Sequence, residues 1–118
     1  MAQQKVEKVE AAGVAMVFTV YKDGTEIGKS EFNQRSILVG RGDAANLRID
    51  DPKASKLHAV IDITSKDAIH ILDLGSTNGT KLNGQTVQAG VPVPLSDGDQ
   101  ITLGAWTRIT VRAIARSA

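Results

Sequence analysis

The stretch that decides the fold spans residues 73–87 and reads DLGSTNGTKLNGQTV. Its second half holds two short runs, 80–82 and 85–87, on either side of Asn83-Gly84. An Asn-Gly pair in this position is the strongest short-range signal for a β-hairpin, because both turn residues must adopt positive φ. Before the hairpin, residues 76–79 place hydroxyls and an amide in a tight turn. The stretch therefore predicts a hairpin preceded by a polar loop.

Outside this stretch, the chain is built from short β-branched runs that are separated by turn residues. The runs expected to form strands are 16–21, 26–32, 36–39, 47–49, 59–63, 68–72, 100–103 and 107–114, in addition to 80–82 and 85–87. Several of them alternate apolar and polar residues, and no window sustains a helical period. Pro92 and Pro94 flank Val93, and because proline has no amide hydrogen we expect this segment at an edge or in a loop. The pattern predicts an all-β sandwich or barrel.

Length indicates one domain, since 118 residues can bury a single core but not two. We expect a tail or linker over residues 1–13, the domain over 14–114 and a short tail over 115–118.

The absence of cysteine excludes a disulfide framework and cysteine-based zinc sites, and it fits a cytoplasmic location. No apolar run approaches the ~20 residues that span a bilayer, and the first residues are too polar for a secretory signal.

Charge and aromatic content narrow the classes of partner. The formal net charge is +1, so a preference for anions must come from the local placement of charged groups. Aromatic residues make up 3% of the chain, which leaves few side chains for base stacking, and the basic stripe of a nucleic-acid-binding protein is missing. We therefore expect no nucleic-acid binding and no insertion into membranes.

Two further polar segments precede the hairpin, and both stand where expected strands end or begin. Gly40-Arg41 follows the run 36–39, and Ser55-Lys56-Leu57-His58 precedes the run 59–63. Loops on a rigid β scaffold are where binding residues concentrate. A guanidinium matches phosphate oxygens and stays charged, a hydroxyl can donate to an oxyanion, and an asparagine side chain can clamp a peptide backbone. These residue types indicate recognition of an anionic ligand, although each residue alone has an ordinary surface interpretation.

In this order and at these separations, the segments resemble a forkhead-associated (FHA) domain, a β-sandwich module that binds phosphothreonine peptides. The resemblance covers about residues 38–104 and rests on VGR at 39–41, DDP at 50–52, SKLHA at 55–59, DLGSTNGT at 73–80, NG at 83–84 and DGDQI at 97–101. Each segment is weak evidence alone, and the ordered set is specific. The resemblance implies an FHA-like β-sandwich of two mostly antiparallel sheets with the binding loops at one end.

The resemblance also implies roles for individual residues. Arg41 and the Ser55 hydroxyl would bind phosphate, Thr77 would assist, and Asn78 would grip the backbone beside the phosphothreonine. Lys56 stands where the family often has arginine or asparagine, and it would add a point charge or be solvated. The expected phosphopeptide-binding residues are thus Arg41, Ser55, Lys56, Thr77 and Asn78, with Lys53, Ala54 and Ala105 as candidates for reading the residues that flank the phosphothreonine.

His58 lies three positions after a serine, a spacing that raises the question of nucleophilic catalysis. A catalytic triad also needs an orienting acid and an oxyanion hole, and nothing in the sequence supplies them. The family uses the matching histidine to hold the phosphate-binding loop in shape. We therefore expect His58 to support the site structurally, together with Gly40, Gly75 and Gly79.

The acidic residues also have a simple interpretation. The pairs at 50–51 and 97–99 lack the remaining ligand spacing of a calcium loop, so we expect them in turns. The sequence accordingly predicts no catalytic residue, no metal and no cofactor.

Taken with the resemblance, these features predict a monomeric interaction module in Ser/Thr kinase signalling, of a kind that often belongs to larger proteins. Its partner would be a protein or peptide that contains phosphothreonine. The alternative is a phosphate-independent scaffold or oligomerisation module that uses the same loops or a sheet edge. Whether binding survives phosphatase treatment of the partner separates the two.

Overall fold

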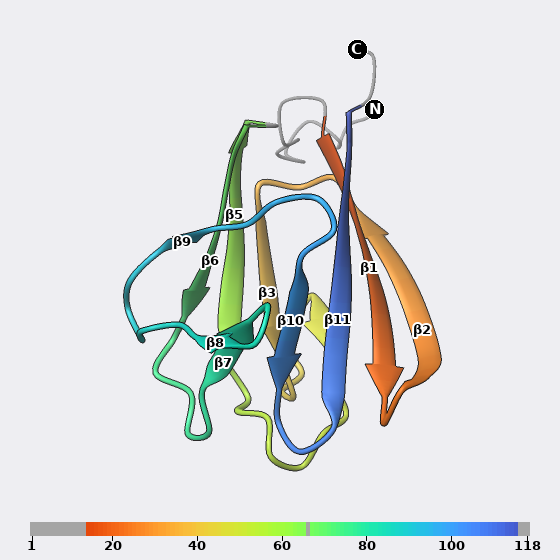
Figure 1. Ribbon diagram of the computed structural model, residues 1–118, viewed down its shortest axis with the longest axis vertical. Coiled ribbons are helices and arrows are strands. Elements are labelled where there is room, and N and C mark those ends of the chain that lie inside the picture. Colours follow the sequence, from red (N-terminus) through yellow and green to blue (C-terminus); the bar gives the residue numbers. More distant parts are fainter. Residues whose placement is uncertain (1–13, 66, 116–118) are drawn as a thin grey trace.

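The computed structural model describes residues 14–65 and 67–115, which form two β-sheets packed face to face (Figure 1). One sheet has six strands in the order β2-β1-β11-β10-β7-β8, and the other has five in the order β4-β3-β5-β6-β9. The strands are β1 (Val14–Lys22), β2 (Thr25–Phe32), β3 (Ser36–Gly40), β4 (Leu47–Arg48), β5 (Ala59–Ser65), β6 (Ala68–Asp73), β7 (Thr80–Leu82), β8 (Gln85–Thr86), β9 (Val93–Pro94), β10 (Gln100–Leu103) and β11 (Thr107–Ala115). The prediction of a sandwich of two mostly antiparallel sheets is confirmed, and the β3–β4 pair is parallel.

Alternation along the strands explains how the two sheets pack. In β1, Met16 and Phe18 are fully buried, and they meet Ile109 and Val111 of β11 and Ile61 of the facing sheet in one apolar core. Because side chains alternate between faces with a period of two, Val17 and Thr19 lie on the other face of β1, where Val17 is half-buried and Thr19 is buried. The same period that predicted the strands therefore also builds the core.

Turn chemistry sets the connections between strands. Asn83 and Gly84 have φ values of 50° and 86°, so both adopt the left-handed backbone that the β7–β8 hairpin requires. Val93 and Pro94 form β9 at the edge of the five-stranded sheet, as the flanking prolines predicted. No helix in residues 14–65 and 67–115 has the length and apolar character needed to cross a membrane.

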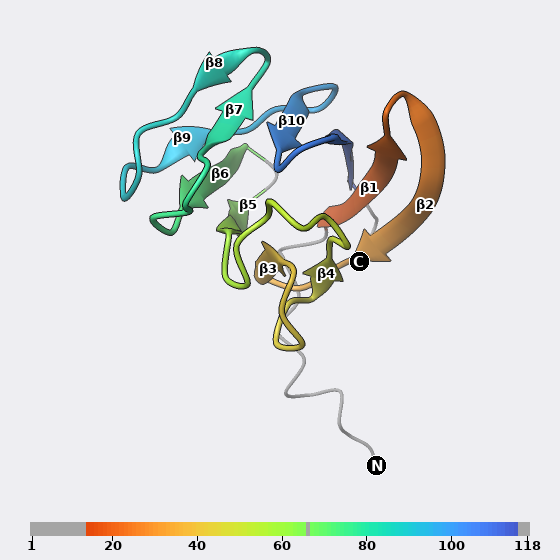
Figure 2. The same ribbon diagram turned by 90° about the horizontal axis from the view of Figure 1, so that it is seen from below.

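The connections that carry the polar residues gather at one end of the sandwich, at the bottom of Figure 1, and Figure 2 views the molecule from that end. They are the segments 41–46, 49–58, 74–79 and 104–106. The expected tail over 1–13 and the residues 116–118 lie outside the described part of the chain. β11 runs to Ala115, one residue past the expected end of the domain.

Candidate functional site

The site begins where β3 ends, at Gly40 and Arg41. The Arg41 amide donates to the Ser55 carbonyl at 3.0 Å, and the Gly42 amide donates to the Lys56 carbonyl at 3.2 Å, so two loops run side by side. A Cβ at Gly40 would lie 2.1 Å from the Lys56 carbonyl oxygen. Gly40 is therefore required for this close approach of two backbones, and not for a positive φ.

The Arg41 side chain is half-buried and held along one edge. Its Nε donates to the Ala54 carbonyl at 2.9 Å. Within the described residues, its two terminal nitrogens donate to no protein acceptor. A guanidinium fixed through Nε presents those nitrogens in a fork that matches two oxygens of a phosphate or carboxylate. Arg48 adds a second guanidinium beside it, because its Nε donates to the Arg41 carbonyl at 3.2 Å.

His58 is fully buried and joins two loops through its ring. The Ser55 amide lies 2.9 Å from Nδ1, and Nε2 lies 3.0 Å from the Gly79 carbonyl oxygen. Because a backbone amide can only donate, Nδ1 carries no hydrogen and Nε2–H donates to Gly79. The neutral ring thus joins the Ser55 loop to the 76–79 turn.

The structure brings the expected ligand-binding residues of these two loops into contact. The Thr77 amide donates to the Ser55 hydroxyl oxygen at 3.0 Å, which leaves the hydroxyl hydrogen available to a ligand. Asn78 Nδ2 donates to the Lys53 carbonyl at 2.9 Å, and the Asn78 side chain is exposed. Arg41, Ser55, Thr77 and Asn78 therefore surround one region at the loop end of the sandwich.

Asp73 organises the 74–80 turn from beneath, a role that the sequence did not assign to it. Its carboxylate accepts bonds from the Gly75 and Ser76 amides at 3.0 Å each, from the Ser76 hydroxyl at 2.5 Å and from the Thr80 hydroxyl at 2.6 Å. Burial alone would raise the pKa of Asp73, but these bonds outweigh it and lower the pKa below its usual value. The sequence contained a signal for this role, because an aspartate two residues before a glycine often closes a turn with its side chain.

Asp51 is the second buried carboxylate that the sequence left in an ordinary turn. It has no exposed surface, and it accepts bonds from the amides of Lys53, Ala105 and Trp106 and from the Thr107 hydroxyl. Burial raises the pKa of Asp51, but the four donors together lower it to about 2. Asp51 therefore joins the 104–106 turn to the loop that carries Ser55.

The remaining expected residues are placed differently from one another. Lys53, Lys56 and Ala105 are exposed at the loop end, where their side chains can meet a ligand. The Ala54 side chain is 2% exposed and packs in the core, so it cannot read a flanking residue, and only its carbonyl takes part, as the acceptor for Arg41. This differs from the expectation for Ala54, because the loop turns inward after Lys53.

Gly75 and Gly79 bound the polar turn, with φ values of 83° and 84°. Residues that carry a side chain adopt this region only with strain, so the turn favours glycine at both positions. The grouping of an anchored guanidinium, a hydroxyl and an exposed amide over fixed loops is suited to holding an anionic group together with the backbone that carries it.

Comparison with known proteins identifies one family. The family model described as "FHA domain" matches residues 37–104. The chain is 34% identical over 92 residues to the proliferation marker protein Ki-67 of Mus musculus, an alignment that covers 78% of this chain and 3% of that protein. The chain thus spans only a small part of that relative.

Solved structures give the same result. The FhaA FHA domain, crystallised in complex with the intracellular domain of another protein, has a TM-score of 0.70 and 33% identity, and covers 82% of this chain and 99% of its own. A structure described as an analysis of phosphothreonine-dependent FHA domain interactions has a TM-score of 0.71 and 33% identity, and covers 83% and 95% of the two chains.

Proposed function

This chain belongs to the FHA domain family, and from that membership we propose that it is a phosphothreonine-dependent protein–protein interaction module. Its ligand is a phosphorylated segment of a partner protein, in the context of Ser/Thr kinase signalling. The solved relatives support this, since one is described by phosphothreonine-dependent interactions and another is bound to the intracellular domain of a second protein. The module acts by binding and carries out no catalysis. We also propose a monomeric domain that works in the cytoplasm.

The observation that carries the proposal is the state of Arg41. Its Nε is held by the Ala54 carbonyl, while its terminal nitrogens are free of protein acceptors among the described residues. Nearby, the Ser55 hydroxyl has its oxygen engaged by the Thr77 amide and its hydrogen left to donate. A phosphate bound here gains charge-assisted hydrogen bonds worth about 1.5–3 kcal/mol each, so the loss of one costs roughly tenfold or more in affinity.

Asn78 and Lys56 complete the proposed contacts. The exposed Asn78 amide borders the phosphate region and is placed to bind the peptide backbone, and Lys56 adds a positive charge at the rim. Arg48, beside Arg41, adds a further charge. These cations attract a dianionic group even though the chain as a whole is nearly neutral.

Preference for phosphothreonine over phosphoserine needs a separate source of energy. Burying one methyl group is worth about 0.8 kcal/mol, or roughly fourfold in affinity. A larger preference requires that the methyl contact also fixes the orientation of the phosphate.

The proposal is tested by titrating the domain with a phosphothreonine peptide library, with unphosphorylated and phosphoserine libraries as controls. We expect binding that phosphatase abolishes, and we expect Arg41→Ala to remove measurable binding without unfolding the domain. Arg35→Ala is the matched control, because Arg35 is exposed just before β3, at the strand end opposite Arg41. A folded domain that binds its partner equally well after phosphatase treatment would instead be the phosphate-independent scaffold.

A further inference from the structure

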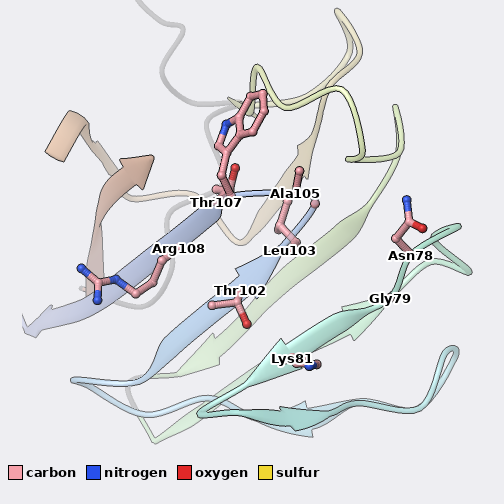
Figure 3. Close-up of a pocket in the computed structure, with 10 residues that line it drawn as sticks. Asn78, Gly79, Lys81, Thr102, Leu103, Ala105, Thr107 and Arg108 are labelled. Atoms are coloured by element: carbon pink, nitrogen blue, oxygen red, sulfur yellow. The ribbon is translucent and has the colours of Figure 1, made fainter. Parts of the chain in front are cut away.

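A groove of about 350 Å³ leads away from Asn78 along the outer face of the six-stranded sheet (Figure 3). Lys81 of β7, Thr102 of β10 and Arg108 of β11 lie opposite one another in the strand register, so they form one row across three strands. Their neighbours in sequence are buried, Leu103 in the core and Thr107 against Asp51. The row therefore faces outward and forms the floor of the groove, while Trp106 borders it at the loop end.

The groove is positively charged and has no acidic lining residue. Lys81 is exposed, and in the described part of the chain neither Lys81 nor Arg108 forms an ion pair. The Arg108 guanidinium stacks over the Tyr21 ring, 4.4 Å from its centroid, and its buried Nε has no hydrogen-bond partner. Lys22, 4.6 Å over the Trp106 ring, adds a third cation at the rim.

The charge is not spread evenly along the groove. Glu26 of β2 stands opposite Tyr21 in the strand register, two strands beyond Arg108, and partly offsets the positive charge at that end. Lys81 lies at the other end, and Figure 3 shows Thr102 between Lys81 and Arg108 with Asn78 on the side away from Arg108. Of the two cations that line the groove, Lys81 is therefore the one on the side of Asn78, the proposed contact for the peptide backbone.

The reach of an extended peptide matches this arrangement. Asn78 and Lys81 are three residues apart, which spans at most about 10 Å at the 3.3 Å rise of a β-strand. An extended peptide covers the same distance in about three residues. A ligand whose backbone is held at Asn78 thus places a residue near Lys81 without bending.

We propose that this groove binds an acidic side chain of the partner, two to four residues from the phosphothreonine. This proposal rests on the proposed function. Lys81 is the main contact of the acidic side chain, and Arg108 is the second cation. The Thr102 hydroxyl lies between them on the floor of the groove. This assigns the reading of a flanking residue to the outer face of the sheet, in addition to the exposed loop residues Lys53 and Ala105.

The test uses phosphothreonine peptides that carry a single glutamate at each position up to four residues on either side, each paired with the glutamine version. Dissociation constants are measured for the wild type, for Lys81→Gln, and for Lys29→Gln as the matched control, since Lys29 is an exposed lysine of β2 outside the groove. We expect one position at which glutamate binds about threefold more tightly than glutamine, as for an exposed ion pair. Lys81→Gln brings that ratio to about one, Lys29→Gln preserves it, and added salt reduces it.

Two results overturn the inference in different ways. If the wild type binds phosphothreonine peptides but prefers glutamate at no position, or if Lys81→Gln keeps the preference, the groove does not read an acidic residue while the proposed function stands. If the wild type binds no phosphothreonine peptide at all, the proposed function fails and this inference fails with it.

Discussion

Replacing Asp51 by asparagine perturbs the contact that joins the 104–106 turn to the loop of Ser55. One or both oxygens of the carboxylate accept bonds from the amides of Lys53 at 2.9 Å, Ala105 at 3.0 Å and Trp106 at 3.0 Å, and from the Thr107 hydroxyl at 2.8 Å. Asparagine keeps one oxygen but turns the other into an NH₂ group that faces donors. Losing the charge-assisted bonds and leaving buried donors unpaired costs about 3 kcal/mol of the free energy of unfolding.

The same substitution changes how stability depends on pH. The pKa of Asp51 falls from the usual 3.8 to about 2 in the folded protein, because four donors outweigh the effect of burial. Between these values the unfolded chain binds the proton more tightly, so stability rises with pH. The stabilisation by ionised Asp51 is complete above about pH 4 and is lost as the pH falls through about 2, a change of about 2 kcal/mol. The free energies of unfolding of the wild type and of Asp51→Asn therefore become more similar as the pH falls toward 2.

Urea unfolding followed by tryptophan fluorescence measures both effects, because Trp106 is the single tryptophan of the chain and its amide bonds to Asp51. Asp50→Asn is the control, since Asp50 is the exposed neighbour, and we expect it to change stability by less than about 0.5 kcal/mol. A loss below about 1 kcal/mol for Asp51→Asn at neutral pH, or a difference from the wild type that persists undiminished in acid, would refute the reasoning.

Two further substitutions test how the site is held. Gly40→Ala places a Cβ 2.1 Å from the Lys56 carbonyl oxygen and should lower the free energy of unfolding by about 1–3 kcal/mol, measured by urea denaturation, whereas Gly28→Ala, which meets no atom within 4 Å, serves as the control. Equal effects of the two would show that the loops do not need the close approach. His58→Ala removes the bonds to Ser55 and Gly79 and should cost about 3 kcal/mol as well as weakening phosphopeptide binding, while His70→Ala, at a half-buried position on the outer face of β6, should do neither. A His58→Ala domain with wild-type stability and affinity would remove His58 from the support of the site.

The strands were predictable from sequence because their signals are local. The apolar alternation at Ala59, Ile61 and Ile63 and the turn at Asn83-Gly84 act over a few residues, and the structure confirms both. The edge position of β9 followed from proline chemistry at Pro92 and Pro94 in the same way. The pairing of strands far apart in sequence, such as β1 with β11, left no local signal, and the choice of a sandwich over a barrel came from the resemblance to a family.

In the candidate site, too, the sequence indicated some residues, and long-range contacts determined the roles of others. Arg41, Ser55 and Asn78 were named through the resemblance to a family, with side-chain chemistry that suits an anion and a peptide, and the folded loops bring them together. The role of Asp51 was not predicted, because three of its four partners, Ala105, Trp106 and Thr107, lie 54 to 56 residues away in the sequence. Ala54 was expected to contact the ligand, but its side chain is buried. Whether a small residue in a loop faces the core depends on how the whole loop is anchored.

The most direct measurement of phosphate recognition is an NMR titration of the isotope-labelled domain with a phosphothreonine peptide, observing the Arg41 side-chain Nε–H and the amides of Ser55, Thr77 and Asn78. If Arg41 holds the phosphate, these signals shift together and follow one dissociation constant, while the unphosphorylated peptide leaves them unchanged. If a phosphopeptide binds and the Arg41 side chain stays unperturbed, with shifts confined to a sheet edge, the proposed site is wrong.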